Sequence, residues 1–173
     1  MSLRFPIGEF QHEGKITDQL VETWIGQIAS LPSEVRHAVQ GLSAEQLDTP
    51  YRPEGWTVRQ VVHHLADSHI NSLIRFKWAL TEDTPTIKPY YEERWAQLAD
   101  YREVAVEDSI RFLEGLHHRW VVLLRALSRD DLARTFVHPD WGVTALDRCV
   151  GVYAWHGRHH VAHITRLAER MGW

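Results

Sequence analysis

Four of the twelve histidines in this chain lie within eight residues near its carboxyl end: His156, His159, His160 and His163. On a helix, residues four apart lie on one face, about 5–6 Å apart at Cβ. The pair His159/His163 and the pair His156/His160 both have this spacing, and either could bind one metal ion. A polar helix face without a metal is the alternative, because histidine is also an ordinary half-buried residue. A metal site would need a third ligand from elsewhere in the chain.

A second histidine-rich stretch, which contains His63, His64 and His69, can supply that ligand. Helical spacing does not choose among the three. Asp67 lies four residues after His63 and three after His64, so it could fix the tautomer of either ring. Three side chains and an open position are typical of a catalytic zinc site, whereas a fourth protein ligand would indicate a structural one. The candidates for such a fourth ligand are His63, His69, His156 and His160.

We expect the other candidate residues to have structural or surface roles and not to bind a metal. His117 falls on an apolar helical stripe and is interpreted as a core residue, while His12, His37 and His138 are expected on the surface or in loops. Cys149 is expected to pack inside the fold. A di-iron site is not expected, because residues 57–80 contain no glutamate to project into a bundle.

Composition places the chain in the globular class. Its 173 residues, 44% hydrophobic, suffice for one domain, which we assign to residues 1–173. A net charge of −4 favours neither nucleic acid nor an anionic membrane as partner. One cysteine and no apparent signal peptide predict a cytoplasmic protein. Eight tryptophans predict an aromatic-walled pocket or a subunit contact.

Apolar periodicity predicts an all-α bundle. Helices are expected over residues 17–31, 33–41, 57–80, 109–127 and 144–171, the first two ending at Pro32 or continuing through a kink there. A capping-box pattern, Thr57 with Gln60, marks the start of the third helix. Residues 137–143 are expected to form a turn or a short extended pair. The long loop 81–106, with Lys88, Tyr90 and Tyr91, is expected to cover a substrate.

Residues 52–69 closely resemble the DinB superfamily, in particular its YfiT-like branch. The resemblance continues through Arg75-Phe76-Lys77, residues 155–164 and the ending Arg170-Met171-Gly172-Trp173. It implies a four-helix metalloprotein that forms a homodimer and binds a divalent metal through His64, His159 and His163. Zinc or nickel is the expected metal, with iron, manganese or cobalt possible. Members of this family are described as metal-dependent hydrolases, and relatives of this branch resemble transferases that join the thiol bacillithiol to an electrophile. The resemblance thus implies a small-molecule substrate and a low-molecular-weight thiol as possible cosubstrate.

The positions of the two histidine stretches constrain the helix order. His64 lies about two turns into its helix and His159 about four turns into the last one, an offset of roughly 12 Å if the helices are parallel and start level. Either the helices are staggered or a connection crosses over, which residues 81–106 are long enough to do. Trp56 and Trp155, each beside a histidine stretch, are expected as pocket walls.

Overall fold

Four long helices dominate the computed structural model, which describes residues 2–173. They are α1 (Asp18–Val39), α3 (Val58–Thr81), α6 (Val106–Arg125) and α8 (Leu146–Met171). Their connections contain the short helices α2 (Ala44–Leu47), α4 (Glu92–Trp95), α5 (Asp100–Glu103) and α7 (Arg129–Leu132), and the antiparallel strands β1 (Thr135–His138) and β2 (Gly142–Ala145). The expected four-helix bundle and extended pair are therefore confirmed. Within residues 2–173, no helix is both long enough and apolar enough to cross a membrane.

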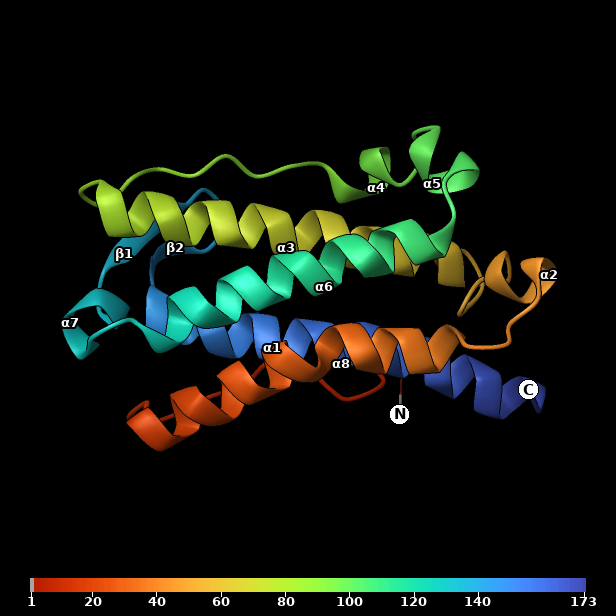
Figure 1. The fold of residues 1–173 in the computed structure, drawn as a ribbon, viewed down its shortest axis with the longest axis horizontal. Coiled ribbons are helices and arrows are strands. Elements are labelled where there is room, and N and C mark those ends of the chain that lie inside the picture. The colour runs from red at the N-terminus through yellow and green to blue at the C-terminus, as the bar shows by residue number, and fades with distance from the viewer. Residues whose placement is uncertain (1) are drawn as a thin grey trace.

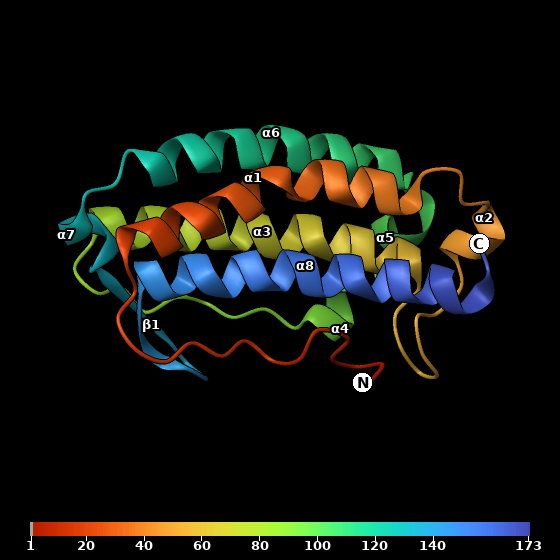
Figure 2. The same ribbon diagram turned by 90° about the horizontal axis from the view of Figure 1, so that it is seen from below.

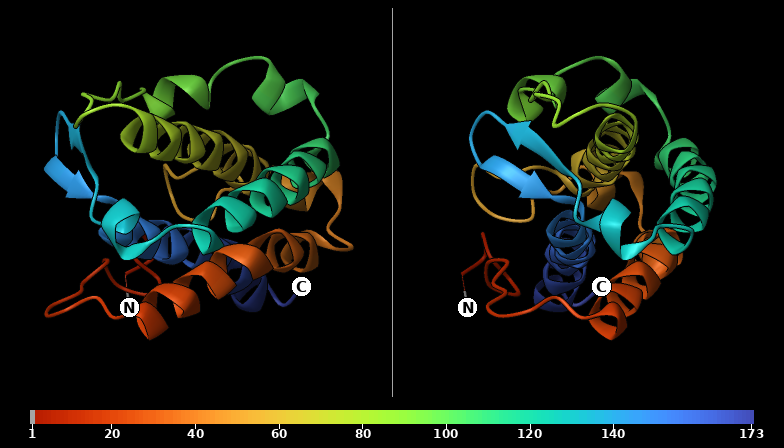
Figure 3. Two further views of the ribbon diagram at one scale, coloured as in Figure 1. Left: turned by 60° about the vertical axis from the view of Figure 1, so that its left-hand side comes forward. Right: turned by 90° about the vertical axis from the view of Figure 1, so that its left-hand side faces the viewer.

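The order of the helices around the bundle differs from their order along the chain. α1 packs against α6 and α8, and α3 packs against the same two helices, so α1 and α3 occupy opposite corners. Figure 1 shows α3 and α6 running in the same direction, with residues 82–105 returning along the whole bundle to join them. The two views of Figure 3 place this crossover outside α3 and the β1–β2 hairpin beside α3 and α8.

α3 and α8 run in opposite directions, as Figures 1 and 2 show. His64 is six residues after the start of α3, and His160 is eleven residues before the end of α8. Because these two ends lie at the same end of the bundle, the two histidine stretches lie at similar heights. The offset of roughly 12 Å that parallel helices would have imposed therefore does not arise.

α1 continues through Pro32, where the sequence led us to expect an end or a kink. Proline has no backbone N–H, so the Ile28 carbonyl lacks its usual helical donor. Figure 2 shows α1 bending along its length, and the two pieces expected there form one helix. The Ile28 carbonyl instead accepts a hydrogen bond from His117 Nδ1 of α6, at 2.6 Å.

α8 lies close against α1 because two of its glycines face that helix. A Cβ on Gly157 would lie 2.6 Å from Leu31 Cδ2, and one on Gly151 would lie 2.8 Å from a ring carbon of Trp24. These distances are shorter than a van der Waals contact, so only glycine fits here without a shift of its neighbours. The glycines thereby set which face of α8 is turned to α1 and which is left for α3.

The expected capping box opens α3. Thr57 Oγ1 accepts from the Gln60 backbone N–H, while Gln60 Oε1 accepts from the Thr57 N–H. Gln60 also donates to the Ala96 carbonyl at 2.9 Å, which ties the crossover to the start of the helix. α6 begins at Val106, three residues before the expected position, and α8 begins two residues later than expected.

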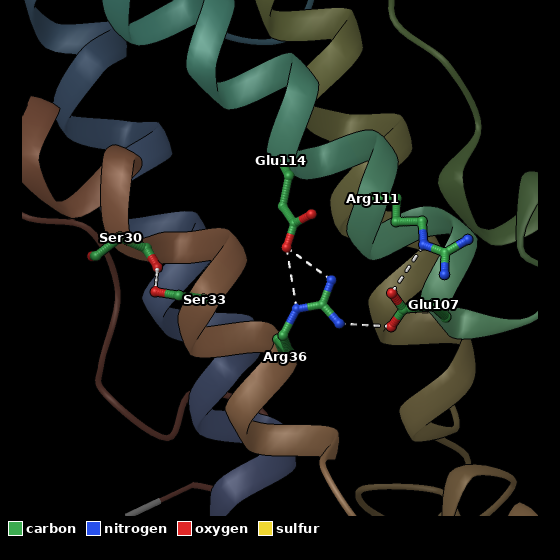
Figure 4. A network of polar contacts seen from close by, with 6 residues as sticks. All are labelled: Ser30, Ser33, Arg36, Glu107, Arg111 and Glu114. Carbon is green, nitrogen blue, oxygen red and sulfur yellow. Dashed lines mark hydrogen bonds and ion pairs between the residues drawn. The ribbon is translucent and has the colours of Figure 1, made fainter.

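On the outside of the bundle, Arg36 joins α1 to α6 (Figure 4). Its guanidinium lies 2.8 Å from Glu107 Oε2 and 2.8 Å from Glu114 Oε1, and Glu107 also accepts from Arg111 Nε at 3.1 Å. Exposed ion pairs of this kind contribute little to stability, so the network mainly sets how the two helices meet.

Candidate metal centre

The structure brings His64 of α3 together with His156 and His160 of α8. One ring nitrogen from each lies within 4.8 Å of the others. The Nε2 atoms of His64 and His156 are 3.3 Å apart. Across residues 2–173, this is the one group of three histidine, cysteine or acidic side chains that meets at such distances.

His159 and His163, the pair that the resemblance implies as ligands, do not join His64 in this group. They follow His156 and His160 by three residues, which turns them about 60° around the helix axis. His159 stacks on Trp155 with ring centroids 4.6 Å apart, and His163 stacks on Tyr51 at 3.9 Å. The geometry therefore favours the pair His156/His160, the alternative that helical spacing left open.

His163 instead contacts His160, on the Nδ1 side of the His160 ring. Its Nε2 lies 3.1 Å from the Arg4 carbonyl, and its Nδ1 lies 3.3 Å from His160 Nδ1. A carbonyl can only accept, so the proton of a neutral His163 is on Nε2 and its Nδ1 accepts from His160 Nδ1–H. The Nε2 lone pair of His160 is then left free to bind a metal.

A longer chain of the same kind supports His156. His117 donates to the Ile28 carbonyl through Nδ1, so its Nε2 accepts from His69 Nδ1–H at 3.0 Å. His69 Nε2 in turn accepts from His156 Nδ1–H at 3.2 Å. With all three rings neutral, the partners assign each tautomer, and the Nε2 lone pair of His156 faces His64. The carbonyl freed by Pro32 is thus the end of this chain.

Burial keeps these rings neutral at physiological pH. It lowers the pKa of His64 to about 3 and the pKa values of His117 and His163 to about 4, because the charged form loses hydration. The pKa values of His69, His156 and His160 are also lowered, chiefly by burial and further by neighbouring imidazoles. Neutral imidazoles are the form that binds metal ions.

Two expected neighbours of the site have other partners. His63 Nδ1 lies 2.7 Å from Ser109 Oγ, and the ring packs edge-on to Tyr101. The sequence suggested that Asp67 could fix the tautomer of His63 or His64. It instead accepts a hydrogen bond from the Tyr101 hydroxyl at 2.7 Å. These residues connect α3 to the crossover and to α6.

The remaining candidates divide between core and surface. His117 and Cys149 are buried as expected, and burial raises the pKa of the Cys149 thiol to about 12. His37 is exposed and His12 half-buried. His138 was expected on the surface or in a loop, but it is buried in β1 and stacks on Trp141 with ring centroids 4.0 Å apart.

A pocket of about 370 Å³ opens onto the histidine group. The residues that line it come from α3, α8, the crossover and the hairpin, and include His64, His156, His160, Ser68, Arg75, Tyr90, Glu92, His138, Asp140 and Tyr153. Trp56 and Trp155 form walls, as expected. From the crossover Tyr90 lines the pocket, whereas the expected Lys88 and Tyr91 do not, and Tyr91 is 71% exposed. The volume suits a small molecule.

The three histidines fit a divalent metal ion. Two nitrogens bonded to one zinc at about 2.0–2.1 Å in tetrahedral geometry stand about 3.3–3.4 Å apart, and His64 and His156 already have that spacing. Two of the three rings, those of His156 and His160, have defined tautomers with free Nε2 lone pairs, and hydrogen-bonded support of this kind is usual behind the ligands of metal sites. His64 Nδ1 is buried without a hydrogen-bond partner.

Sequence reasoning found both histidine stretches but missed the parts of the site that depend on tertiary packing. The roles of His69 and His163 behind the ligands depend on ring positions, and periodicity does not give those. Pro32 was a usable signal, since a proline inside a helix frees a carbonyl that some other donor must satisfy. Arg75 and Tyr153, which meet in the pocket at 3.2 Å, gave no separate signal.

Comparison with known proteins gives concordant matches. The DinB superfamily matches residues 27–164. A protein of Bacillus cereus and one of Bacillus anthracis, each named "Putative metal-dependent hydrolase", are both 57% identical over 171 residues, covering 99% of this chain and 98% of theirs. The solved structure of YfiT from Bacillus subtilis is 48% identical, with a TM-score of 0.96 over 99% of this chain and 98% of that one. It is described as a probable metal-dependent hydrolase with an unusual four-helix bundle topology.

Proposed function

The chain belongs to the DinB superfamily, and from this premise we propose that it is a metal-dependent enzyme whose divalent cation binds His64, His156 and His160. The main support is that all three rings line an accessible pocket. Among the described residues, no fourth histidine, cysteine or carboxylate joins the group to close it. A purely structural site would be closed in that way.

When bound, the cation would supply Lewis acidity and so would lower the pKa of water or a thiol at this site. The residues of this chain hold and shield it. His69 and His163 keep the ligand tautomers, while Trp56 and Trp155 limit access of bulk water. Zinc or nickel suits three imidazoles, and iron, manganese or cobalt can also bind such a site.

Two reactions use these parts, hydrolysis and transfer of a low-molecular-weight thiol to an electrophile. Hydrolysis follows the names of the relatives, and Glu92 is the pocket carboxylate best suited to take a proton, because partial desolvation raises its pKa. Thiol transfer is favoured by the lack of a carboxylate in the histidine group, since a thiol ionises near pH 8.5 without a separate base.

Activity profiling of the metal-reconstituted protein tests the proposal. Zinc-, nickel- and cobalt-loaded protein would be offered esters and amides in water, and then electrophiles with several small thiols. We expect turnover that requires metal, disappears in His156→Ala and persists in the control His118→Ala, whose side chain is exposed on α6. Full metal loading with no turnover, and a cobalt spectrum that no substrate perturbs, would favour a metal carrier or a metal-stapled bundle instead.

We further propose that the protein acts as a cytoplasmic homodimer, as the family resemblance implies. Trp78, Trp141 and Trp173 remain 38–53% exposed, so aromatic side chains are available for a subunit contact. Sedimentation velocity at micromolar concentration measures the mass directly. A single monomer species would contradict the proposal.

A further inference from the structure

Arg75 is a buried cation without a matching anion. Arg75 is only 5% exposed, yet it belongs to α3 and lines the pocket. Its one hydrogen bond to protein runs from Nη1 to the Tyr153 hydroxyl, at 3.2 Å. Arginine has five N–H donors and stays charged, so most of this donor capacity is unused within residues 2–173. A buried charge in that state is costly unless something else pairs with it.

The acidic residues nearby do not neutralise it. Glu92 and Asp140 also line the pocket, but neither comes within 4.0 Å of the Arg75 guanidinium. Arg75 acts on Glu92 at longer range, where it lowers the pKa of a carboxyl that burial otherwise raises. The fold therefore does not supply the ion pair that a structural role for Arg75 would require.

Two more donors that line this pocket lack protein acceptors. His138 Nδ1 accepts from the Asp140 backbone N–H at 3.1 Å, so the proton of its neutral ring is on Nε2 and can be donated. The hydroxyl of Tyr90 is buried with no hydrogen-bond partner. A guanidinium, an imidazole N–H and a phenol thus line one pocket with N–H and O–H donors that no protein acceptor takes up, a donor set that suits an anion.

This donor set shares a wall with the histidine group. Arg75 follows His64 by eleven residues, close to three full turns, so both lie on the same face of α3, about 16 Å apart along its axis. Between them the pocket wall is formed by Ser68 and by Tyr153, whose ring centroid is 5.7 Å from that of His156. The pocket thus has the histidine group at one end and Arg75 toward the other.

We propose that this pocket selects substrates bearing a carboxylate, which Arg75 binds with help from His138 and Tyr90, while the reacting group lies at the histidine group. The placement of the reacting end rests on the proposed function; the anion site itself rests on Arg75. A planar carboxylate matches the forked guanidinium, and its charge supplies the missing counterion. The substrate is therefore an extended small molecule with its carboxylate several bonds from the reacting centre.

A series of ω-mercapto carboxylic acids of increasing chain length, each paired with its neutral amide, tests this in cobalt-loaded protein. Calorimetry measures affinity, and the visible spectrum of the cobalt reports independently whether the sulfur reaches the metal. A buried charge-assisted pair predicts that the best acid binds about 10–100-fold more tightly than its amide. Arg75→Gln should abolish that preference without changing cobalt content, Arg75→Lys should restore part of it, and the exposed control Arg119→Gln should leave it intact.

The outcomes separate the two proposals. Equal binding of every acid and its amide by the wild-type protein, or a preference that survives in folded Arg75→Gln, overturns the anion site. If no thiol perturbs the cobalt spectrum, the thiol reaction fails, but the acid–amide preference still decides the role of Arg75. If Arg75→Gln does not fold, wild type is compared with Arg75→Lys, which keeps the charge but loses the forked guanidinium. A smaller ratio of acid to amide affinity in Arg75→Lys supports the anion site, and an unchanged ratio overturns it.

Discussion

Whether His163 is a metal ligand or a support for one can be decided by two kinds of substitution. In the structure its Nε2 donates to the Arg4 carbonyl and its Nδ1 accepts from His160. Glutamine can do both, with its amide N–H and its carbonyl, whereas leucine can do neither. We therefore expect His163→Gln to bind zinc nearly as tightly as wild type and His163→Leu to bind it more weakly. At His160, a ligand in our assignment, glutamine should not rescue the loss seen with leucine.

The structure sets the size of the effect. In His163→Leu the Nδ1–H of His160, a residue 8% exposed, loses its acceptor, which costs about 1–3 kcal/mol. Losing such outer support typically weakens metal binding about 10–100-fold, equivalent to about 1.4–2.7 kcal/mol. Removing a ligand should instead abolish stoichiometric binding. One assay can therefore rank the zinc affinities of His163→Gln, His163→Leu and the variants of His160.

Competition with a chromophoric chelator at pH 7.5, with total zinc checked by elemental analysis, measures these affinities. The exposed His118→Gln serves as the control for loss of a histidine on the surface. The reasoning is refuted if His163→Gln loses stoichiometric zinc while His160→Gln keeps it. That result would restore the ligand set His64, His159 and His163 that the family resemblance implies.

Three further predictions follow from the packing. His69→Phe, which removes the acceptor of His156 Nδ1–H, should weaken zinc binding about 10–100-fold in the same chelator assay, and His69→Gln should weaken it less; equal affinities would exclude the chain from His117 to His156 as a support. Metal-free protein should lose stability as the pH falls from 6.5 to 4, because the folded state resists protonation of His117, whose pKa is about 4, while the unfolded state takes up the proton near 6.5. In urea unfolding, His117→Gln should therefore lose about 3 kcal/mol less stability than the wild-type protein over this pH range. Gly157→Val should destabilise the fold by about 1–3 kcal/mol through its clash with Leu31, whereas Gly115→Ala, which meets no atom within 4 Å, should be neutral or stabilising, as thermal unfolding would show.

The sequence predicted the helices and the residues of the site better than their grouping. Periodicity and the Thr57 capping box located α3 to within a residue, because capping and amphipathic packing are local effects. The sequence left open whether the first helix ends at Pro32 or continues through a kink, because the donor that replaces the lost helical bond comes from α6, eighty-nine residues away. Local rules cannot foresee such a partner.

Helical spacing could not decide between the two histidine pairs for a similar reason. Both pairs have the same spacing, and what separates them is the rotation of α8 about its axis. That rotation depends on Gly151 and Gly157 meeting α1, a contact that only the assembled bundle reveals. His138 was misplaced because a loop position next to Pro139 looks exposed until the hairpin folds onto α3 and α8.

The connectivity of this bundle has a direct bearing on its chemistry. The crossover of residues 82–105 makes α3 and α8 adjacent and antiparallel, which brings His64 level with His156 and His160. It also places α6 between α1 and α3, so that His117 can join the Ile28 carbonyl of one to His69 of the other. In a simple up-down order α1 and α3 would be neighbours, and no α6 side chain would stand between them. The tautomer of His156 thus depends on the path of the chain, because the carbonyl freed by Pro32 directs the Nε2 lone pair of His156 toward His64 only through α6.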